Sequence, residues 1–462
     1  MMIGGAGLTL LSFLSMGIIG NLFSSESFAI FRLVLTYGAI FSLLFTLRID
    51  LSIVVSKTNK EAIKKVQQLI VQVFFIFFFF YSVFNLFNFE LILYDFGITQ
   101  TILNLFLFTG IFLAFTEIFI QFFIFKNRYK SVSFIQIIYS LFFSVMLIYL
   151  YLINYGDISP SLSRLMSLVL GTLIFLILLF RDFNFKKIKN PFTFIILNKD
   201  YPLKNLPYSI STQFTQSIPI LLLIYLGSES LAGKFAFLLS LAMFPGMFLN
   251  GSMGKVFFRK TAEFNADKAK IFKLLDMLMK ITLIITIPLS LVFFVYYDLI
   301  ISLLFGSTWL DLSFDPRLIF ICGLLYFFSS WPERIFVVLN KQGLILKNQI
   351  IFDAIMLSML LIIFYKTREP NYIIYTYIFI NFLYHVAYAS LSYFVVTNKF
   401  RKYFIGGLFF ILFLILSIYF VEHLNVVLGN FNFTLFFWSA LALYAIVAFK
   451  KIKTLFKHIG NL

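Results

Sequence analysis

The strongest constraint on this chain is the recurrence of long apolar runs over nearly all of its length. An α-helix needs roughly 20 apolar residues to cross about 30 Å of hydrocarbon. About fourteen segments meet this need, and they lack the strict alternation of barrel strands. We therefore predict an all-α polytopic membrane protein. The segments are 3–23, 28–55, 66–89, 98–125, 132–154, 162–180, 207–227, 231–256, 271–297, 318–339, 347–365, 371–397, 403–421 and 431–449.

Composition excludes the main alternatives to a membrane protein. Of the 462 residues, 61% are hydrophobic and only 12% are charged, whereas a soluble domain carries about a quarter charged residues. The single cysteine, Cys322, excludes an intramolecular disulfide and a multi-cysteine metal site. The three histidines lie far apart in sequence, so we expect neither a metal nor a cofactor.

The distribution of basic residues predicts the orientation of the chain. If the N-terminus is inside, 29 of the 37 Lys and Arg residues lie on the inner side and 5 on the outer side. Such a bias is typical of cytoplasmic loops, so we expect both termini in the cytoplasm. The net charge of +17 then faces anionic lipid, and no nucleic-acid partner is needed to explain it.

An internal repeat suggests how the helices are grouped. Residues 25–58 and 228–261 are identical at 10 of 34 positions, and both windows contain the tripeptide Ser-Glu-Ser. Both windows also cover an outer turn and the helix after it, which indicates parallel repeats with a substrate site between them. We expect two six-helix lobes around a central cavity and an additional C-terminal helix pair. The boundaries are 1–180 and 207–397 for the lobes, 181–206 for a basic cytoplasmic linker, and 398–462 for the pair with its basic tail.

Cations inside the spans are candidate substrate ligands, because a charge at mid-bilayer costs roughly 2.5–3.5 kcal/mol on insertion scales. Arg32 and Arg48 lie near the two ends of the second span, and Lys234 lies at the outer end of the eighth. A guanidinium binds phosphate oxygens bidentately and stays charged when buried. The alternative for each is a side chain that reaches to the nearest interface. Asp276 and Lys280, four residues apart, are interpreted as a local ion pair.

Acidic residues and one histidine are candidates for coupling to an ion. Glu117 lies deep in the fourth span, and Asp353 and His385 lie in the eleventh and twelfth. A buried carboxylate or imidazole can exchange a proton or hold a cation, although a structural hydrogen bond between helices is the competing explanation. Asp50 is a fourth candidate. Two residues apart on one continuous helix, Arg48 and Asp50 would point to nearly opposite faces, so we do not expect them to pair.

The seventh span carries a polar stripe. Ser209, Gln213, Gln216 and Ser217 recur at helical spacing in this segment, which also contains Pro207 and Pro219. Hydroxyl and amide groups in a cavity suit sugars better than a hydrophobic drug. Hydrogen bonding between helices explains the stripe equally well.

Two stretches resemble one transporter family. Thr46-Leu47-Arg48-Ile49-Asp50 followed by Glu61-Ala62 resembles the second span and first cytoplasmic loop of Wzx-type polysaccharide (O-antigen) flippases. Residues 201–263, with Pro207-Tyr208 and Ile218-Pro219, are similar to the same family at its seventh and eighth spans. The resemblance covers roughly the first 270 residues. The superfamily also includes multidrug extruders and lipid II flippases, and membership implies alternating access.

This resemblance implies a flippase of the bacterial inner membrane. Its substrate would be an undecaprenyl-pyrophosphate-linked oligosaccharide repeat unit for O-antigen, capsule or exopolysaccharide biosynthesis. A proton or sodium gradient would drive transport, with Arg32, Arg48, Lys234, Gln213 and Gln216 in the substrate cavity. Membrane lipids, a polysaccharide polymerase and a chain-length regulator would be its partners.

Two other functions are compatible with a polytopic chain. A multidrug or small-molecule cation antiporter of the same fold would need a cavity dominated by acidic groups. A polysaccharide polymerase or ligase would need catalytic groups on a substantial outer loop, and the longest outer loop expected here is only 298–317. We therefore expect a transporter and not an enzyme.

Overall fold

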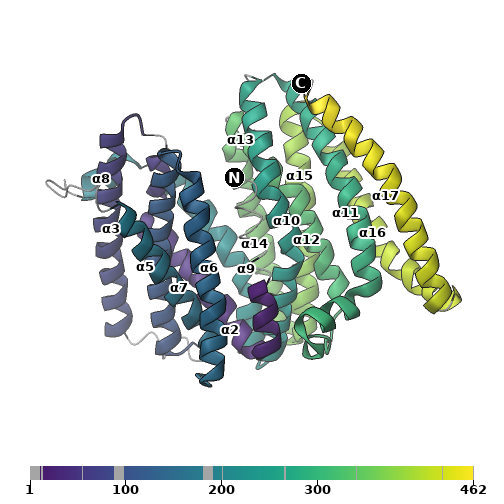
Figure 1. The fold of residues 1–462 in the computed structure, drawn as a ribbon, viewed down its shortest axis with the longest axis horizontal. Helices are drawn as coiled ribbons and strands as arrows, with labels where there is room; N and C mark the ends of the chain where they lie inside the picture. Colours follow the sequence, from purple (N-terminus) through teal and green to yellow (C-terminus); the bar gives the residue numbers. More distant parts are fainter. Residues whose placement is uncertain are drawn as a thin grey trace. The chain divides into compact units, whose positions relative to one another are not determined.

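The computed structural model is helical wherever it has regular structure among the residues it describes (Figure 1). These residues are 11, 14–54, 56–87, 98–179, 191–199, 201–264, 267–339, 341–428 and 430–460.

The chain forms two compact units, and the first comprises Met1–Phe237 with Leu357–Ile373. Residues 14–22 are helical in this unit. The other elements that begin in it are α2 (Ser25–Thr46), the 3₁₀ turn η1 (Ile49–Ile53), α3 (Asn59–Leu86), α5 (Gln100–Phe125), α6 (Tyr129–Leu152), α7 (Ser159–Leu179), α8 (Pro191–Leu197), the π-helical turn η4 (Tyr201–Asn205), α9 (Leu206–Tyr225) and α10 (Glu229–Glu263).

The second unit comprises Leu238–Met356 with Ile374–Leu462, so the boundary falls inside three long helices. The remaining elements are α11 (Lys268–Phe305), η5 (Ser307–Trp309), α12 (Pro316–Ser330), η6 (Trp331–Glu333), α13 (Arg334–Val338), α14 (Gln342–Thr367), α15 (Pro370–Thr397), α16 (Phe400–Leu428) and α17 (Asn430–Gly460).

The helices confirm the prediction of an all-α polytopic membrane protein. Among the described residues, nine helices are long and apolar enough to cross a membrane, namely α2, α3, α5, α6, α7, α11, α14, α15 and α16. Each remaining predicted segment also overlaps a helix, formed by residues 14–22, α9, α10, α12 or α17.

Two predicted spans are wrong in their extent. The segment 28–55 is not one helix, because α2 ends at Thr46 and the next two residues, Leu47 and Arg48, have left-handed backbones with φ of 49° and 59°. The segment 318–339 is interrupted after Ser330 by the turn η6. Pro332 lies in that turn, where its ring and missing N–H disfavour a continuing helix.

Small residues allow α2 and α5 to pack closely within the first unit. A Cβ atom on Gly110 would lie 2.6 Å from the Cβ of Phe41, and one on Gly38 would lie 2.7 Å from Cγ2 of Thr109. Such small-residue contacts bring helix backbones together in a membrane, where apolar burial against lipid gives little driving force. The crossing fixes α2, which carries Arg32 and leads into Arg48, against α5, which carries Glu117.

Candidate functional site

The polar face of α9 lies against α2, and both candidate arginines bond to it. Arg32 on α2 donates from Nη2 to Oε1 of Gln216 over 3.2 Å. Arg48, just beyond the end of α2, donates from Nε to the hydroxyl of Ser209 over 3.0 Å. Two guanidinium groups and two members of the predicted polar stripe therefore meet along one helix pair.

The break after α2 corrects the prediction that Arg48 and Asp50 do not pair. Nη1 of Arg48 lies 3.9 Å from Oδ2 of Asp50, within ion-pair distance but too long for a hydrogen bond. The prediction assumed a continuous helix, whereas the left-handed backbone at Arg48 redirects the chain into η1. A non-glycine residue in this conformation costs on the order of 1–3 kcal/mol, and such strain is often found at functional positions.

Asp50 is a nearly inaccessible carboxylate, with 2% of its side chain exposed. Neither of its oxygens has a hydrogen bond of good geometry, so Arg48 is its main electrostatic partner. Burial raises the pKa of the Asp50 carboxyl above its ordinary value, and the Arg48 charge opposes that rise. Glu117 on α5 interacts electrostatically with both residues, repelled by Asp50 and attracted by Arg48. We call Arg48, Asp50, Glu117 and Ser209 the η1 charge cluster.

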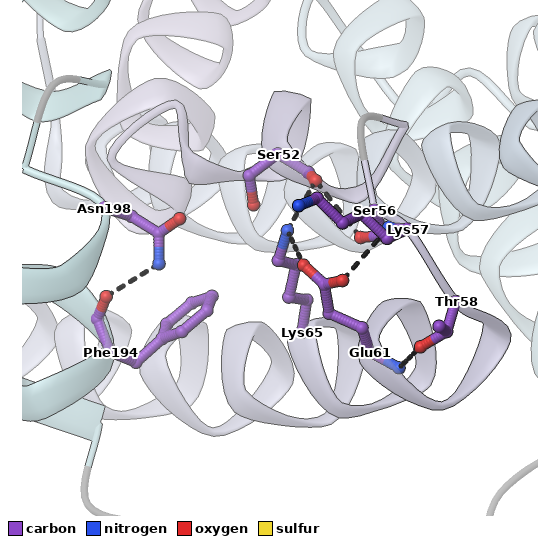
Figure 2. A network of polar contacts seen from close by, with 8 residues as sticks. All are labelled: Ser52, Ser56, Lys57, Thr58, Glu61, Lys65, Phe194 and Asn198. Atoms are coloured by element: carbon purple, nitrogen blue, oxygen red, sulfur yellow. Dashed lines mark hydrogen bonds and ion pairs between the residues drawn. The ribbon is translucent and has the colours of Figure 1, made fainter.

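A separate network holds η1 against the start of α3 (Figure 2). Lys65 donates from Nζ to the carbonyl of Ser52 over 2.9 Å and pairs with Oε1 of Glu61 over 2.9 Å. Glu61 also accepts from the backbone N–H of Lys57, while Thr58 caps α3 by accepting from the N–H of Glu61. The Thr58 bond is the N-cap half of a helix-capping box, whereas Glu61 bonds to the residue before the cap, and Lys65 extends the network to η1. The contact from Lys65 to Ser52 thus fixes the C-terminal end of η1, the turn that carries Asp50.

The other two predicted substrate residues lie in the same unit. Gln213 is partly buried on α9, between the residues that bind Arg48 and Arg32. Lys234 is partly buried near the start of α10. The hydroxyls of Ser25 and Ser230 lie 2.8 Å apart, so the first turns of α2 and α10 are in contact. Arg32 on α2 and Lys234 on α10 therefore each lie shortly after the first turn of a helix, and these two first turns are in contact.

In the second unit, the two predicted titratable residues, Asp353 and His385, form hydrogen bonds with different partners. Asp353 on α14 accepts from Nε2 of Gln349 over 2.7 Å, and Oε1 of Gln349 accepts from the Tyr384 hydroxyl over 2.7 Å. His385 instead has Nδ1 2.9 Å from the hydroxyl of Ser329 on α12. The relay from Asp353 through Gln349 to Tyr384 was not predicted. The spacing of Gln349 and Asp353, four residues apart, is the signal that could have indicated its first half.

One further expectation concerns a charged pair on α11. The predicted local pair of Asp276 and Lys280 is confirmed, with Oδ2 and Nζ 2.5 Å apart. Among the described residues, no group of three or more His, Cys, Asp or Glu side chains is arranged to hold a metal ion.

Comparison with known proteins assigns the sequence to a family. The sequence model of a family described as "Polysaccharide biosynthesis protein" matches residues 18–313. No curated protein sequence matches the chain significantly.

Solved structures with the same fold are transporters. The lipid II flippase MurJ, in an inward closed conformation, is 16% identical, with a TM-score of 0.62 and alignment over 100% of this chain and 99% of that chain. A multidrug resistance MATE family transporter of the MOP superfamily, in an inward-facing conformation, is 15% identical, with a TM-score of 0.61 and coverage of 86% and 96%. At these identities the likeness concerns fold alone. The family model confirms the predicted resemblance to a polysaccharide biosynthesis family, and the two solved structures confirm the predicted fold.

Proposed function

Because this chain belongs to the polysaccharide biosynthesis protein family, we propose that it is a flippase for lipid-linked oligosaccharide. It moves undecaprenyl-pyrophosphate-linked repeat units from the cytoplasmic to the outer leaflet of the bacterial inner membrane by alternating access. Such a substrate combines a doubly anionic pyrophosphate diester, neutral sugars and a long apolar tail. Each part needs a different protein surface, and the first two can be assigned to residues of the first unit.

The arrangement of Arg48 is the observation that carries the proposal. Its side chain is 29% exposed, and it binds Ser209 through Nε. Among the described residues the one carboxylate within ion-pair distance of Arg48 is that of Asp50, which at 3.9 Å lies beyond hydrogen-bond distance. The terminal Nη groups are therefore oriented by two neighbours without being satisfied by them. This is the state that suits a bidentate pyrophosphate ligand.

The remaining substrate residues extend this site along α9 and α10. Arg32 donates to Gln216, a neutral partner that orients the guanidinium. Gln213 supplies an amide between the two arginines, where a sugar hydroxyl can donate and accept hydrogen bonds. Lys234, near the start of α10, adds a further cation at the same end of the unit as Arg32. Substrate would pass from the η1 charge cluster toward Arg32 and Lys234 as the lobes rock.

Coupling to a proton or sodium ion is assigned first to Asp50 and Glu117. Two carboxylates in electrostatic contact cannot both be charged without cost, so one of them retains a proton or attracts a cation. In the second unit Asp353 and His385 are the corresponding candidates. Their hydrogen bonds to Gln349 and Ser329 would have to be exchanged during such a step.

The cellular setting follows from the charge bias and the substrate. Both termini are in the cytoplasm, the basic inner loops face anionic lipid, and the protein delivers its product to a polysaccharide polymerase with its chain-length regulator. The glycan belongs to O-antigen, capsule or exopolysaccharide synthesis.

Ligand-induced stabilisation of the purified chain tests the substrate class. A ligand at 100 times its dissociation constant stabilises the folded state by about 2.7 kcal/mol. We expect a polyprenyl-diphosphate oligosaccharide to raise the melting temperature in detergent, and the matching polyprenyl alcohol to raise it much less. The lipophilic cation tetraphenylphosphonium should leave it unchanged. Stabilisation by the cation alone would contradict the flippase assignment and favour a multidrug antiporter.

A further inference from the structure

A pocket of about 210 Å³, lined by both polar and apolar groups, lies at the end of the first unit where α2 begins and α6 ends. It is lined by the segment before α2, the last turn of α6 and the loop that leads into α7. The proposed topology puts this end on the outer side of the membrane. The pocket is separate from the η1 charge cluster, which lies beyond the opposite end of α2.

The polar side of the pocket is held in place by hydrogen bonds. The Ser27 hydroxyl donates to Oδ1 of Asp157, and Ser24 accepts from the backbone N–H of Ser27 over 3.1 Å. No hydrogen bond to Oδ2 of Asp157 is found within the described part of the chain, so this oxygen can accept from a ligand. Asn154 and Gly156 have left-handed backbones, with φ of 51° and 99°. This tight turn places an amide and a carboxylate on the same short loop.

Aromatic rings form the other side. Tyr151 is 41% exposed and Tyr155 is 51% exposed, although both line the pocket. Phe23 packs edge-on against Tyr151 with ring centroids 5.7 Å apart, which fixes that ring. A flat aromatic surface beside a few oriented acceptors and an amide is the lining expected for a ligand with both C–H and hydroxyl faces.

The lining excludes the other ligands that a flippase meets. It contains no lysine or arginine, so it has no group to neutralise a phosphate. It contains one carboxylate, which is too few for a divalent cation with six or more oxygen ligands. Its volume is below the roughly 300–1,000 Å³ of pockets that enclose drug-sized molecules, so it accommodates a single ring.

We propose that this pocket binds one neutral sugar residue of the translocated glycan on the outer side of the membrane. The ring stacks on Tyr155 or Tyr151, and its hydroxyls donate to Asp157 and exchange hydrogen bonds with Asn154. This inference rests on the proposed flippase function. It adds a contact that holds the glycan outside after the pyrophosphate has left the arginines, and so disfavours its return.

Sugar binding can be measured without transport. Saturation-transfer difference NMR on the full chain in detergent, titrated with the methyl glycosides of glucose, galactose, rhamnose and N-acetylglucosamine, should give signals for at least one of them. We expect Tyr155→Ala and Asp157→Asn each to weaken that binding at least fivefold. Asn154→Gly should also weaken it, and this variant keeps the turn intact because glycine readily adopts the left-handed backbone.

Tyr149→Ala is the matched control. Tyr149 lies on α6, the helix that carries Tyr151, and is 53% exposed but does not line the pocket. Its loss should therefore change binding less than twofold. Absence of binding to all four glycosides would overturn the proposal, as would equal binding by the wild type and the three pocket variants. Glycoside binding by a chain that does not translocate lipid-linked glycan would instead contradict the proposed function and leave the pocket assignment standing.

Discussion

Replacing Arg48 by glycine should lower the rate of substrate translocation about ten- to hundredfold per folded molecule. A hydrogen bond to a charged group contributes about 1.5–3 kcal/mol, and each 1.4 kcal/mol is a factor of ten. Glycine removes the guanidinium that would hold the pyrophosphate. It also relieves the left-handed backbone at φ 59° but deprives Asp50 of its main electrostatic partner, so exchange rates are compared per amount of folded protein.

Two comparison variants separate the phosphate role from a general effect of positive charge. Arg128 is an exposed arginine just before α6, on the same side of the membrane in the proposed topology, and Arg128→Ala should translocate at the wild-type rate. Arg48→Lys keeps the charge but lacks the planar fork, so it should be intermediate. The measurement is leaflet exchange in vesicles with equal protein content. Wild-type exchange by the glycine variant would reject the role of Arg48.

Replacing Asp50 by asparagine should raise the melting temperature at neutral pH and strengthen substrate binding there. Because burial raises the pKa of Asp50, the folded state binds its proton more tightly than the unfolded state does. The charged carboxylate therefore costs stability as pH rises through the raised pKa, and this cost is absent below the ordinary value of about 3.9. Asparagine removes the cost, so the two proteins should converge in acid.

Substrate binding should follow the same titration. A deprotonated Asp50 attracts Arg48 and competes with the pyrophosphate, whereas a protonated Asp50 does not. Wild-type affinity should then fall as pH rises, and the Asp50→Asn variant should show a flatter profile. By reciprocity, substrate should promote proton uptake at this site. Asp311→Asn, in an exposed loop between η5 and α12, is the control and should match the wild type. An unchanged pH profile in the Asp50→Asn variant would contradict the coupling role.

The helices were predictable because each membrane span must satisfy its own backbone hydrogen bonds and needs a long apolar run. The residues at which the helices end were harder to predict. Nothing in the sequence around Leu47 indicates a left-handed backbone, since neither it nor Arg48 is a glycine or asparagine. That one break changed the geometry of the site. It brought Arg48 within ion-pair distance of Asp50, two residues that a continuous helix would have kept apart.

Contacts between helices were predictable in kind but not in detail. The polar stripe on α9 indicated hydrogen bonding, yet only the fold shows that Ser209 and Gln216 face α2. The bond between Gln349 and Tyr384 joins two helices with no sequence relation, so no spacing rule could indicate it. Apolar segments carry little information on which helices are neighbours, because many faces are equally apolar.

Leaflet exchange of a labelled polyprenyl-diphosphate oligosaccharide tests the central claim most directly. The purified chain is reconstituted in vesicles with the label in one leaflet, and exposure of the glycan on the other leaflet is followed over time. The flippase assignment predicts exchange much faster than in protein-free vesicles, with acceleration by a proton or a sodium gradient. Absence of exchange by intact, folded protein under both gradients would contradict it.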